Sequence, residues 1–356
     1  MSIRTVPWWS RLGLALLCLT WSGPIGSAQG VSVPSTVETS GLELITPATQ
    51  QAINRGLESL AASQQEDGSF GSGSTHRRHV AVTALAGMAF LSAGNVPERG
   101  KYGRTVQRAV DYILANTDPT GLISAPEHRQ QNPMYGHGFA TLFLAEVYGM
   151  TRQSEVRDKL KLAINLIVSS QNREGGWRYF PVRREADVSA TVCQIMALRA
   201  ARNAGMYVPK STVDACTRYV KQCQNPDGGF SYQLLAGTQS IWPRSAAGLV
   251  ALYSAGIYEG REIEKGLRYL MGHIPRGEVF RHEAFYYYGH YYAVQAMWHA
   301  GGNYWRQWYP AIRDELLNRQ TQNGSWSDMT VNSEYATAMA CIVLQMPNNY
   351  LPIFQR

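Results

Sequence analysis

Three residues able to do acid–base or metal chemistry stand at the same place in similar short segments. His79 begins His-Val-Ala-Val-Thr, His137 begins His-Gly-Phe-Ala-Thr, and Asp187 begins Asp-Val-Ser-Ala-Thr. Imidazole and carboxylate groups transfer protons and also bind zinc. If these segments start parallel helices at one end of the molecule, the three side chains share a rim and are the candidate catalytic residues. Ser333 begins a fourth such segment, Ser-Glu-Tyr-Ala-Thr.

Each of these residues also has a structural interpretation. Asp187 and Ser333 are of the types preferred at helix N-caps, where the side-chain oxygen accepts a bond from a free backbone N–H, and we predict capping for both. Histidine is a weaker cap, so a site role and a structural role stay open for His79 and His137. A zinc site built from His79, His137 and Asp187 is an alternative, and no other cofactor is predicted.

A second group of residues indicates a ligand cavity. The run from Phe285 to Tyr292 reads Phe-Tyr-Tyr-Tyr-Gly-His-Tyr-Tyr. Phenols on a buried helix each need a hydrogen-bond partner or a wet cavity, so this run is predicted to line a cavity wall. The cavity is expected to hold further aromatic rings from the same layer of helices, those of Phe143, Tyr292 and Trp298. The candidate ligand-binding residues are Arg244, Tyr286, His290, Tyr291, Phe139 and Tyr335.

The elements that must position these side chains are marked by a repeated turn. Gln171 to Trp177 reads Gln-Asn-Arg-Glu-Gly-Gly-Trp, and Gln224 to Phe230 reads Gln-Asn-Pro-Asp-Gly-Gly-Phe. Weaker copies end at residues 70, 122, 280 and 326, which gives steps of 46 to 55 residues. A period near 50 found six times indicates a repeat architecture.

Each repeat unit is predicted to hold two helices around that turn. The first helices carry mixed charge and are expected at 47–64, 103–116, 154–170, 209–223, 260–272 and 306–320. The second helices are rich in Ala, Leu and Met and are expected at 78–93, 137–149, 187–203, 243–255, 284–299 and 333–345. A helix that is apolar most of the way round must be buried, so the second helices should form an inner ring and the first helices an outer one.

Six helix pairs could form an open superhelix or a closed ring. An open superhelix usually needs polar end caps, yet the last inner helix, Ala-Thr-Ala-Met-Ala-Cys-Ile-Val-Leu at 336–344, is as apolar as the central ones. We therefore predict an all-α, six-hairpin (α/α)6 toroid in a single domain, residues 47–346, followed by a C-terminal tail, 347–356.

The repeated turn resembles that of the squalene cyclase and prenyltransferase family, whose repeat is a Gln, a few residues, then Gly and an aromatic. The copies at 171–177, 224–230 and 320–326 carry the resemblance most clearly, and it covers about residues 47 to 346. It implies an α/α toroid with a central cavity. It does not imply one reaction, because a fold hosts many functions.

The catalytic motifs of that family are incomplete in this chain. Terpene cyclases that start by protonation use Asp-x-Asp-Asp on an inner helix, and the matching stretch from Asp187 reads Asp-Val-Ser-Ala. Ser189 stands at the place of the proton-donating carboxylic acid and cannot protonate an alkene. The zinc-dependent prenyltransferases use Asp-x-Cys there, so Ser189 also replaces their zinc-binding Cys, and the next inner helix, from Ile241, supplies no His.

The N-terminal sequence and the composition indicate in which compartment the protein works. Arg4 and Arg11 precede an apolar run, and Gly-Ser-Ala at 26–28 is typical of a signal-peptidase site, so we expect a cleaved signal peptide, 1–28, and a secreted or periplasmic protein. Its removal takes away two arginines and lowers the formal charge from +7 to +5. Residues 29–46 are expected to form a mobile leader. The mature chain shows no transmembrane run and no dense basic cluster of the kind that binds nucleic acid.

Four cysteines remain after that cleavage, at 193, 216, 223 and 341. An even count in an exported protein allows disulfides. Cys216 and Cys223 are seven residues apart in a predicted helix, about 10 Å along its axis, which is too far to bridge.

The sequence thus predicts an exported toroid that binds a small apolar or isoprenoid-like molecule in an aromatic-lined central cavity. A first alternative is an enzyme whose catalytic residues are His79, His137 and Asp187 on the rim. It would be a divergent terpene cyclase, a divergent prenyltransferase or a glycan-active enzyme. The last is included because Asp187, Glu185 and Glu334 could supply paired carboxyl groups. A second alternative is a scaffold whose partner is another protein.

Overall fold

The computed structural model describes residues 41–234, 237, 239–275 and 284–355. The predicted signal peptide, most of the predicted leader and the fifth repeated turn, 274–280, lie wholly or largely outside these residues. The described residues form twelve α-helices and no β-strand. The outer helices are α1 (Pro47–Ala62), α3 (Gly103–Ala115), α5 (Ser154–Ser170), α7 (Lys210–Gln222), α9 (Arg261–Met271) and α11 (Gly302–Arg319). The inner helices are α2 (Val80–Ser92), α4 (Pro133–Thr151), α6 (Val188–Asn203), α8 (Trp242–Ser254), α10 (Tyr286–Ala300) and α12 (Ser333–Leu344).

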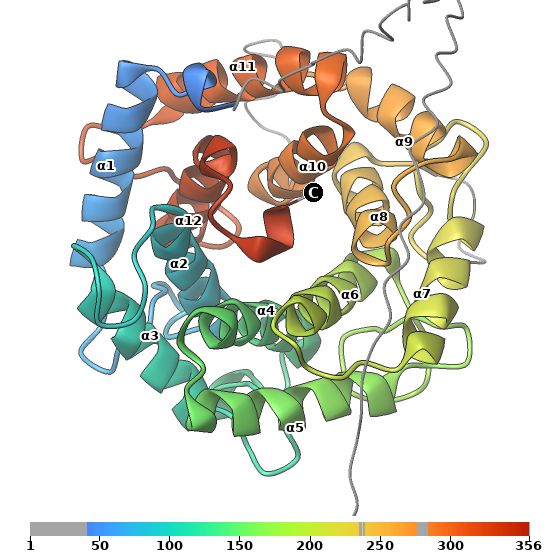
Figure 1. The fold of residues 1–356 in the computed structure, drawn as a ribbon, viewed down its shortest axis with the longest axis horizontal. Helices are drawn as coiled ribbons and strands as arrows, with labels where there is room; N and C mark the ends of the chain where they lie inside the picture. Colours follow the sequence, from blue (N-terminus) through green and yellow to red (C-terminus); the bar gives the residue numbers. More distant parts are fainter. Residues whose placement is uncertain (1–40, 235–236, 238, 276–283, 356) are drawn as a thin grey trace, which may run out of the picture. The chain divides into compact units, whose positions relative to one another are not determined.

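The two sets of helices form two concentric rings, as their composition predicts (Figure 1). In α2 every residue but Ala81 is buried, because this helix lies between the outer ring and its inner neighbours. In α9 only Ile263, Gly266, Leu267 and Leu270 are buried. Their spacing of three and four residues places them on one face of the helix, and the remaining face carries the charged side chains into water.

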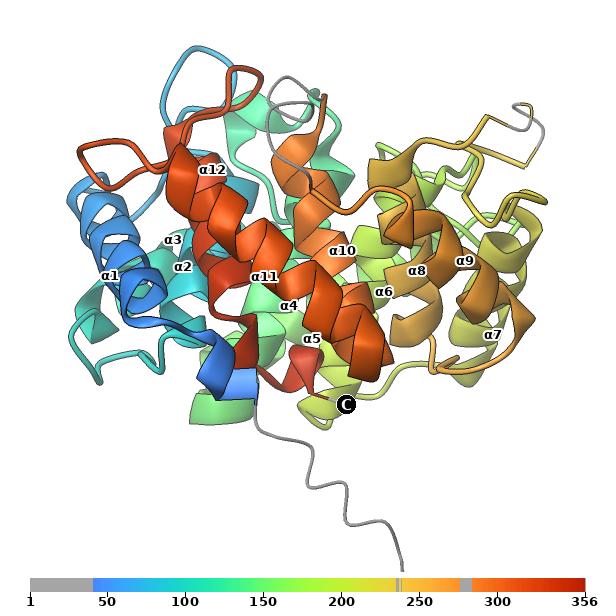
Figure 2. The ribbon, with the colours of Figure 1, turned by 90° about the horizontal axis from the view of Figure 1, so that it is seen from above.

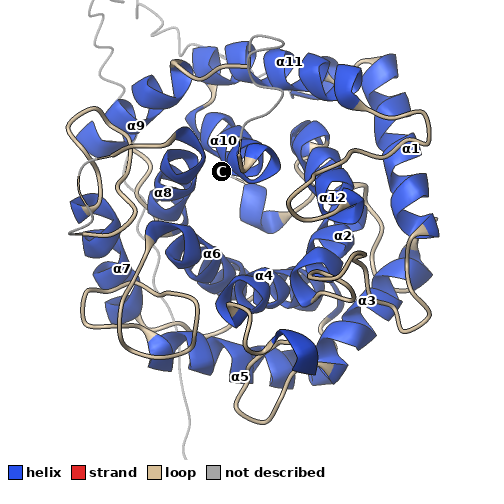
Figure 3. Ribbon diagram, turned by 180° about the vertical axis from the view of Figure 1, so that it is seen from behind, coloured by secondary structure: helices blue, strands red, loops and turns tan. Residues whose placement is uncertain are grey.

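The ring closes on itself. The predicted toroid is therefore confirmed, and the helix pairs do not form an open superhelix. The last inner helix, α12, packs against both α1 and α2, which joins the sixth repeat to the first (Figure 3). Gln320 donates from Nε2 to the carbonyl of Ala52 in α1 at 2.8 Å. Gly324, with φ 88°, lies so close to α1 that an added Cβ would stand 2.7 Å from the Arg55 carbonyl oxygen.

In the described part of the chain, the repeated turn joins one outer helix to the next at four junctions. Gln171 donates from Nε2 to Gly175 O at 2.8 Å and to Thr212 O of the next outer helix, α7, at 2.9 Å. Gln64, Gln224 and Gln320 make the same pair of bonds at their own turns. The Gln of the repeat therefore joins neighbouring units, because its amide donates both to a carbonyl of its own turn and to a carbonyl near the start of the next outer helix.

The same turn is tied to the inner helix that follows it. The backbone N–H of the closing aromatic donates to a hydroxyl one turn inside that helix: Phe70 to Thr83, Trp177 to Thr191, Phe230 to Ser245 and Trp326 to Thr337, all at 2.9 to 3.0 Å. This contact gives a physical reason for the Thr that ends the short segments starting at residues 79, 187 and 333, and Ser245 takes the same place in α8. Buried backbone N–H groups need a partner, and the hydroxyl supplies it.

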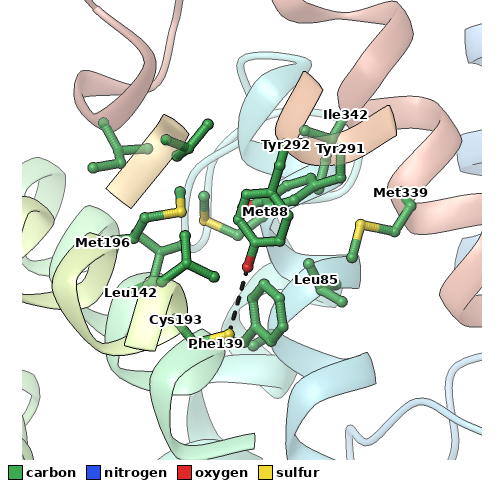
Figure 4. Packing of buried hydrophobic residues seen from close by; sticks show 14 of the residues in the cluster. Leu85, Met88, Phe139, Leu142, Cys193, Met196, Tyr291, Tyr292, Met339 and Ile342 are labelled. Atoms are coloured by element: carbon green, nitrogen blue, oxygen red, sulfur yellow. Dashed lines mark hydrogen bonds between the residues drawn. The ribbon is translucent and has the colours of Figure 1, made fainter. Parts of the chain in front are cut away.

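The centre of the ring is filled at the end away from these turns. Met88, Met196, Met339, Tyr291 and Tyr292 are all buried there and pack together, as Figure 4 shows. Tyr292 Oη lies 3.4 Å from Cys193 Sγ. Cys193 and the cysteines at 216, 223 and 341 are buried and form no disulfide.

The chain ends complete the same side of the ring (Figure 2). The C-terminal tail turns into the inner ring, with Ile353 and Phe354 buried and Phe354 O accepting from Trp298 Nε1 at 2.8 Å. Residues 41–44, part of the predicted leader, form a short 3₁₀ turn, and Leu44 O accepts from Arg313 of α11. None of the helices in the described ranges has the length and apolarity that a membrane crossing requires.

Candidate functional site

A cavity of about 470 Å³ opens at the end of the ring where the inner helices begin. Nineteen of the described residues line it, contributed by the first turns of the inner helices and the loops before them. Seven of these residues are aromatic: Tyr135, Phe139, Tyr179, Tyr232, Phe285, Tyr288 and Tyr335. None of the nineteen is Asp or Glu. The volume falls in the range of small-molecule sites, and the lining suits an apolar molecule.

Four of the predicted site residues line this cavity. Phe139 and Tyr335 face it from α4 and α12, and Arg244 faces it from the first turns of α8. His79 lines it at the start of α2, where its Nδ1 accepts a hydrogen bond from Ala81 N at 3.1 Å. His79 is therefore an N-cap and a cavity residue at once.

The other predicted aromatic and histidine residues of α10 lie in the packed core. Tyr291 packs edge-on against Phe139 at 6.0 Å between ring centroids, below the cavity. Tyr286 lies under the Arg319 guanidinium at 3.9 Å, on the side of α10 that faces the outer ring. His290 packs against Trp242 and Trp308, and burial lowers its pKa to about 3. Helical geometry is the reason, because only one face of α10, that of Tyr288, meets the cavity.

Asp187 is fully buried behind the cavity wall. Its Oδ1 accepts from Ala190 N at 2.8 Å, so the predicted N-cap of α6 is confirmed. Its Oδ2 lies 4.0 Å from Arg178 Nε. Burial raises the pKa of Asp187 to about 6, although its N-cap bond and Arg178 act in the opposite direction. The residue of this segment that faces the cavity is Ser189.

His137 has a structural contact in place of the one made by hydroxyl groups in other repeats. The helix α4 begins at Pro133, one turn before the predicted start, so His137 lies inside it and is fully buried. Its Nδ1 accepts from Ile123 N at 3.2 Å, in the second repeated turn. Burial lowers the pKa of His137 to about 4, so the ring is neutral and able to accept this bond.

The predicted cap at Ser333 was wrong by one residue. Asn332 is the N-cap of α12, and its Oδ1 accepts from Tyr335 N at 2.9 Å. Asn is as good a cap as Ser, so the side chain one position earlier takes the role. Ser333 becomes the first residue of the helix.

His79, His137 and Asp187 do not form a common centre. The part of the chain that the structure describes holds no group of three His, Cys, Asp or Glu side chains arranged to bind a metal ion. Nor do Glu185 and Glu334 face each other across the cavity, since neither lines it. The Glu185 side chain pairs with Arg178, and Glu334 accepts from Ser72 Oγ at 2.9 Å.

Several residues that line the cavity were not predicted from the sequence. Tyr179 and Tyr232 each stand two residues after a closing aromatic, in Gly-Gly-Trp-Arg-Tyr and Gly-Gly-Phe-Ser-Tyr, so the repeat itself carried a signal for them. Their two hydroxyls hydrogen-bond to each other across the wall. Tyr288 belongs to the predicted tyrosine run but was not singled out from it, because the spacing of residues does not tell which of several adjacent rings faces a cavity.

Comparison with known proteins agrees with this architecture. The family model of the prenyltransferase alpha-alpha toroid domain matches residues 38–200 and 107–271. The chain belongs to this family. Together the two matches span most of the chain, and the repeated hairpins that they cover are those of the closed ring.

The individual relatives are more distant. The chain is 36% identical over 86 residues to the drimenyl diphosphate synthase of Streptantibioticus cattleyicolor, which is 24% of this chain and only 15% of that protein. Its fold is similar to the α-1,6-mannanase GH76A of Salegentibacter sp. HEL1_6, with 8% identity, a TM-score of 0.60, and 85% and 99% of the two chains covered. It is also similar to the type II terpene cyclase MstE of Scytonema, with 12% identity, a TM-score of 0.59, and 86% and 98% covered. At these identities the structural likeness establishes the fold and no activity.

Proposed function

We propose that this toroid binds an apolar, isoprenoid-like molecule in the cavity at the start of the inner helices. The observation that carries the proposal is the cavity itself, about 470 Å³, whose described lining residues are mostly aromatic and aliphatic and include no carboxylate. Burial of apolar ligand surface against such a wall is the main source of affinity in sites of this kind. In the same fold, the cyclase MstE was solved with geranylgeranyl dihydroxybenzoate, an isoprenoid-bearing substrate.

The proposal is binding without the standard cyclase or zinc-prenyltransferase chemistry. Ser189 faces the cavity where the cyclase motif has its proton-donating acid, and a hydroxyl is far too weak an acid for that step. The acid nearest in sequence, Asp187, is buried, and one of its carboxylate oxygens accepts the hydrogen bond that caps α6. We further propose, from the N-terminal sequence, that the protein works outside the cytoplasm as a carrier or sensor.

A variant that fills the cavity tests this function. Ala81 lines the cavity and is only partly buried, whereas Ala48 is exposed on α1 and is not among the lining residues. Farnesol, an isoprenoid alcohol, is titrated against the purified protein, with tyrosine and tryptophan fluorescence and thermal shift as readouts. Wild type should bind and melt at a higher temperature, because a ligand that binds only the folded state stabilises it by about 2.7 kcal/mol at a hundred times Kd.

The two variants should differ in their affinity for farnesol. Ala81→Phe should weaken farnesol binding at least tenfold while the ligand-free melting temperature stays near that of wild type. Ala48→Phe, the matched control, should bind as wild type does. Equal binding by both variants would place the ligand elsewhere, and no binding by wild type would refute the proposal.

A further inference from the structure

One end of the cavity wall carries a positive charge that an apolar ligand does not need. Arg244 is about half-buried and lines the cavity. Its Nε donates to Phe230 O at 2.9 Å, and its Nη2 donates to Gln239 O at 2.6 Å. These two bonds fix the plane of the guanidinium, which has five N–H donors in all. Burial lowers the pKa of Arg244, yet a guanidinium remains charged at any physiological pH.

None of the described residues that line the cavity carries a charge opposite to that of Arg244. The other residues of the lining that could carry a positive charge are His76 and His79, and burial lowers the pKa of both, that of His79 to about 3. They are therefore neutral near pH 7. The described residues of the lining include no Asp or Glu, so Arg244 is the one fixed charge among them.

A second guanidinium lies just behind the same wall. Tyr232 has the Arg244 guanidinium 5.8 Å from its ring centroid and the Arg178 guanidinium 5.9 Å from it. Arg178 also lies over Tyr179, at 5.1 Å. We call Arg178, Tyr179, Tyr232 and Arg244 the cationic corner of the cavity.

The nearby carboxylates are engaged away from the cavity. Glu185 pairs with Arg178, and Asp187 Oδ2 lies 4.0 Å from the same guanidinium. Glu185 and Asp187 both offset the charge of Arg178, and Asp187 also acts electrostatically on Arg244 from behind the cavity wall. The structure thus holds a positioned, partly desolvated cation at a cavity wall, with the aromatic ring of Tyr232 beside it. A partly buried charge costs free energy unless a partner of opposite sign meets it.

We propose that the cationic corner binds the anionic end, a carboxylate or a phosphate, of the apolar ligand, with Arg244 as the residue that selects it. This inference rests on the proposed function, since it assumes that the apolar part of the ligand occupies the cavity. Arg244 donates to the anion, and within the Tyr179–Tyr232 pair the hydroxyl that accepts from its partner keeps its own proton as one further donor in the same wall. The ligand would then lie with its charged end at α8 and its apolar part against Phe139 and Tyr335.

Three matched probes test the inference: farnesol, farnesoic acid and farnesyl monophosphate, which share one apolar chain. Wild type should bind at least one of the two anions ten or more times tighter than farnesol, because a charge-assisted hydrogen bond in a partly buried site contributes a factor of that order. Whichever anion binds tighter identifies the head group. The preference should decrease at high salt.

The variant Arg244→Gln should lose the preference and keep its affinity for farnesol within about threefold. The control Arg184→Gln, an exposed arginine of a loop at the same end of the ring, should keep the preference. Arg244→Lys, which retains the charge with fewer donors, should keep part of it, and circular dichroism of each free variant checks the fold. Should farnesol bind but wild type show no preference, or should Arg244→Gln retain it, the corner is not an anion site while the cavity proposal stands. If none of the three probes binds, both proposals fail.

Discussion

The closed ring makes a quantitative prediction at the seam between the sixth repeat and the first. Gln320 donates from one Nε2 group to Gly324 O and to Ala52 O, both at 2.8 Å. Gln171 makes the equivalent bonds at an internal junction, to Gly175 O and Thr212 O. If the ring is one cooperative unit, the seam is an ordinary junction, and the two substitutions Gln320→Ala and Gln171→Ala should have equal effects.

The expected magnitude follows from the bonds that are lost. Each substitution removes two partly buried hydrogen bonds, which contribute about 1 kcal/mol apiece to the free energy of unfolding. The loss is therefore about 2 kcal/mol per variant. For a domain of roughly 300 residues, the unfolding entropy converts this into a fall in melting temperature of about 3 °C.

Urea unfolding followed by circular dichroism and tryptophan fluorescence measures both variants against wild type. The two probes report helices and buried indoles separately, so a seam that opens first would appear as two non-coincident transitions. A loss below about 0.5 kcal/mol for Gln320→Ala, together with about 2 kcal/mol for Gln171→Ala, would refute the reasoning. That result would mean that the seam is open in solution and that the first and last repeats behave as the frayed ends of a superhelix.

Three further predictions concern single residues. Burial raises the pKa of Glu146 in α4 to about 8, so this carboxyl is protonated in the folded protein at pH 7, whereas in the unfolded chain it ionises near its usual pKa of 4.5. The free energy of unfolding of wild type relative to Glu146→Gln should therefore be highest at low pH and fall by on the order of 3 kcal/mol between pH 4.5 and pH 7. Parallel curves of stability against pH for the two proteins would contradict this. Gly175→Ala should lower the free energy of unfolding by about 3 kcal/mol or more, because φ is 104° and the added Cβ would stand 2.2 Å from a carbonyl oxygen of α7. Gly73→Ala, with φ 79° and open space around the Cβ, should lower it by only about 1 to 2 kcal/mol, and thermal melts of both variants measure the difference. Asp187→Asn keeps an N-cap of equal quality and lies behind the cavity wall, so farnesol affinity should stay within about threefold, and a tenfold loss would instead place the carboxyl in the site.

Much of the fold was open to prediction because it rests on local chemistry repeated six times. The inner helices were placed to within a few residues from their apolar composition, and the largest error, at α4, arose because Pro133 begins the helix one turn before the predicted start. The Thr or Ser shared by the inner-helix segments was also visible, although its role, accepting the N–H of a closing aromatic, was not. Helix formation and turn geometry depend on near neighbours in the chain, so they leave a pattern that can be read in order.

The candidate site was only partly predictable, because its residues meet across repeats. Phe139, Arg244 and Tyr335 were singled out from residue type and do line the cavity. Tyr286 and Tyr291 were of the right type and lie in the core, since the face of α10 that meets the cavity is set by how that helix is rotated against its neighbours.

The sequence by itself determined the all-helical repeat, the division into a buried and an exposed layer, and the turn that joins the units, since each follows from the chemistry of one repeat. Only the tertiary structure decided which end of the ring stays open. The tail that buries Ile353 and Phe354 and the rings of Tyr291 and Tyr292 fill one end, while the loops before the inner helices leave the cavity at the other. It also decided that Arg244 meets the cavity beside Tyr232, and that Asp187 lies behind the wall. These relations join side chains tens of residues apart, and they depend on packing density and helix rotation, which no local pattern encodes.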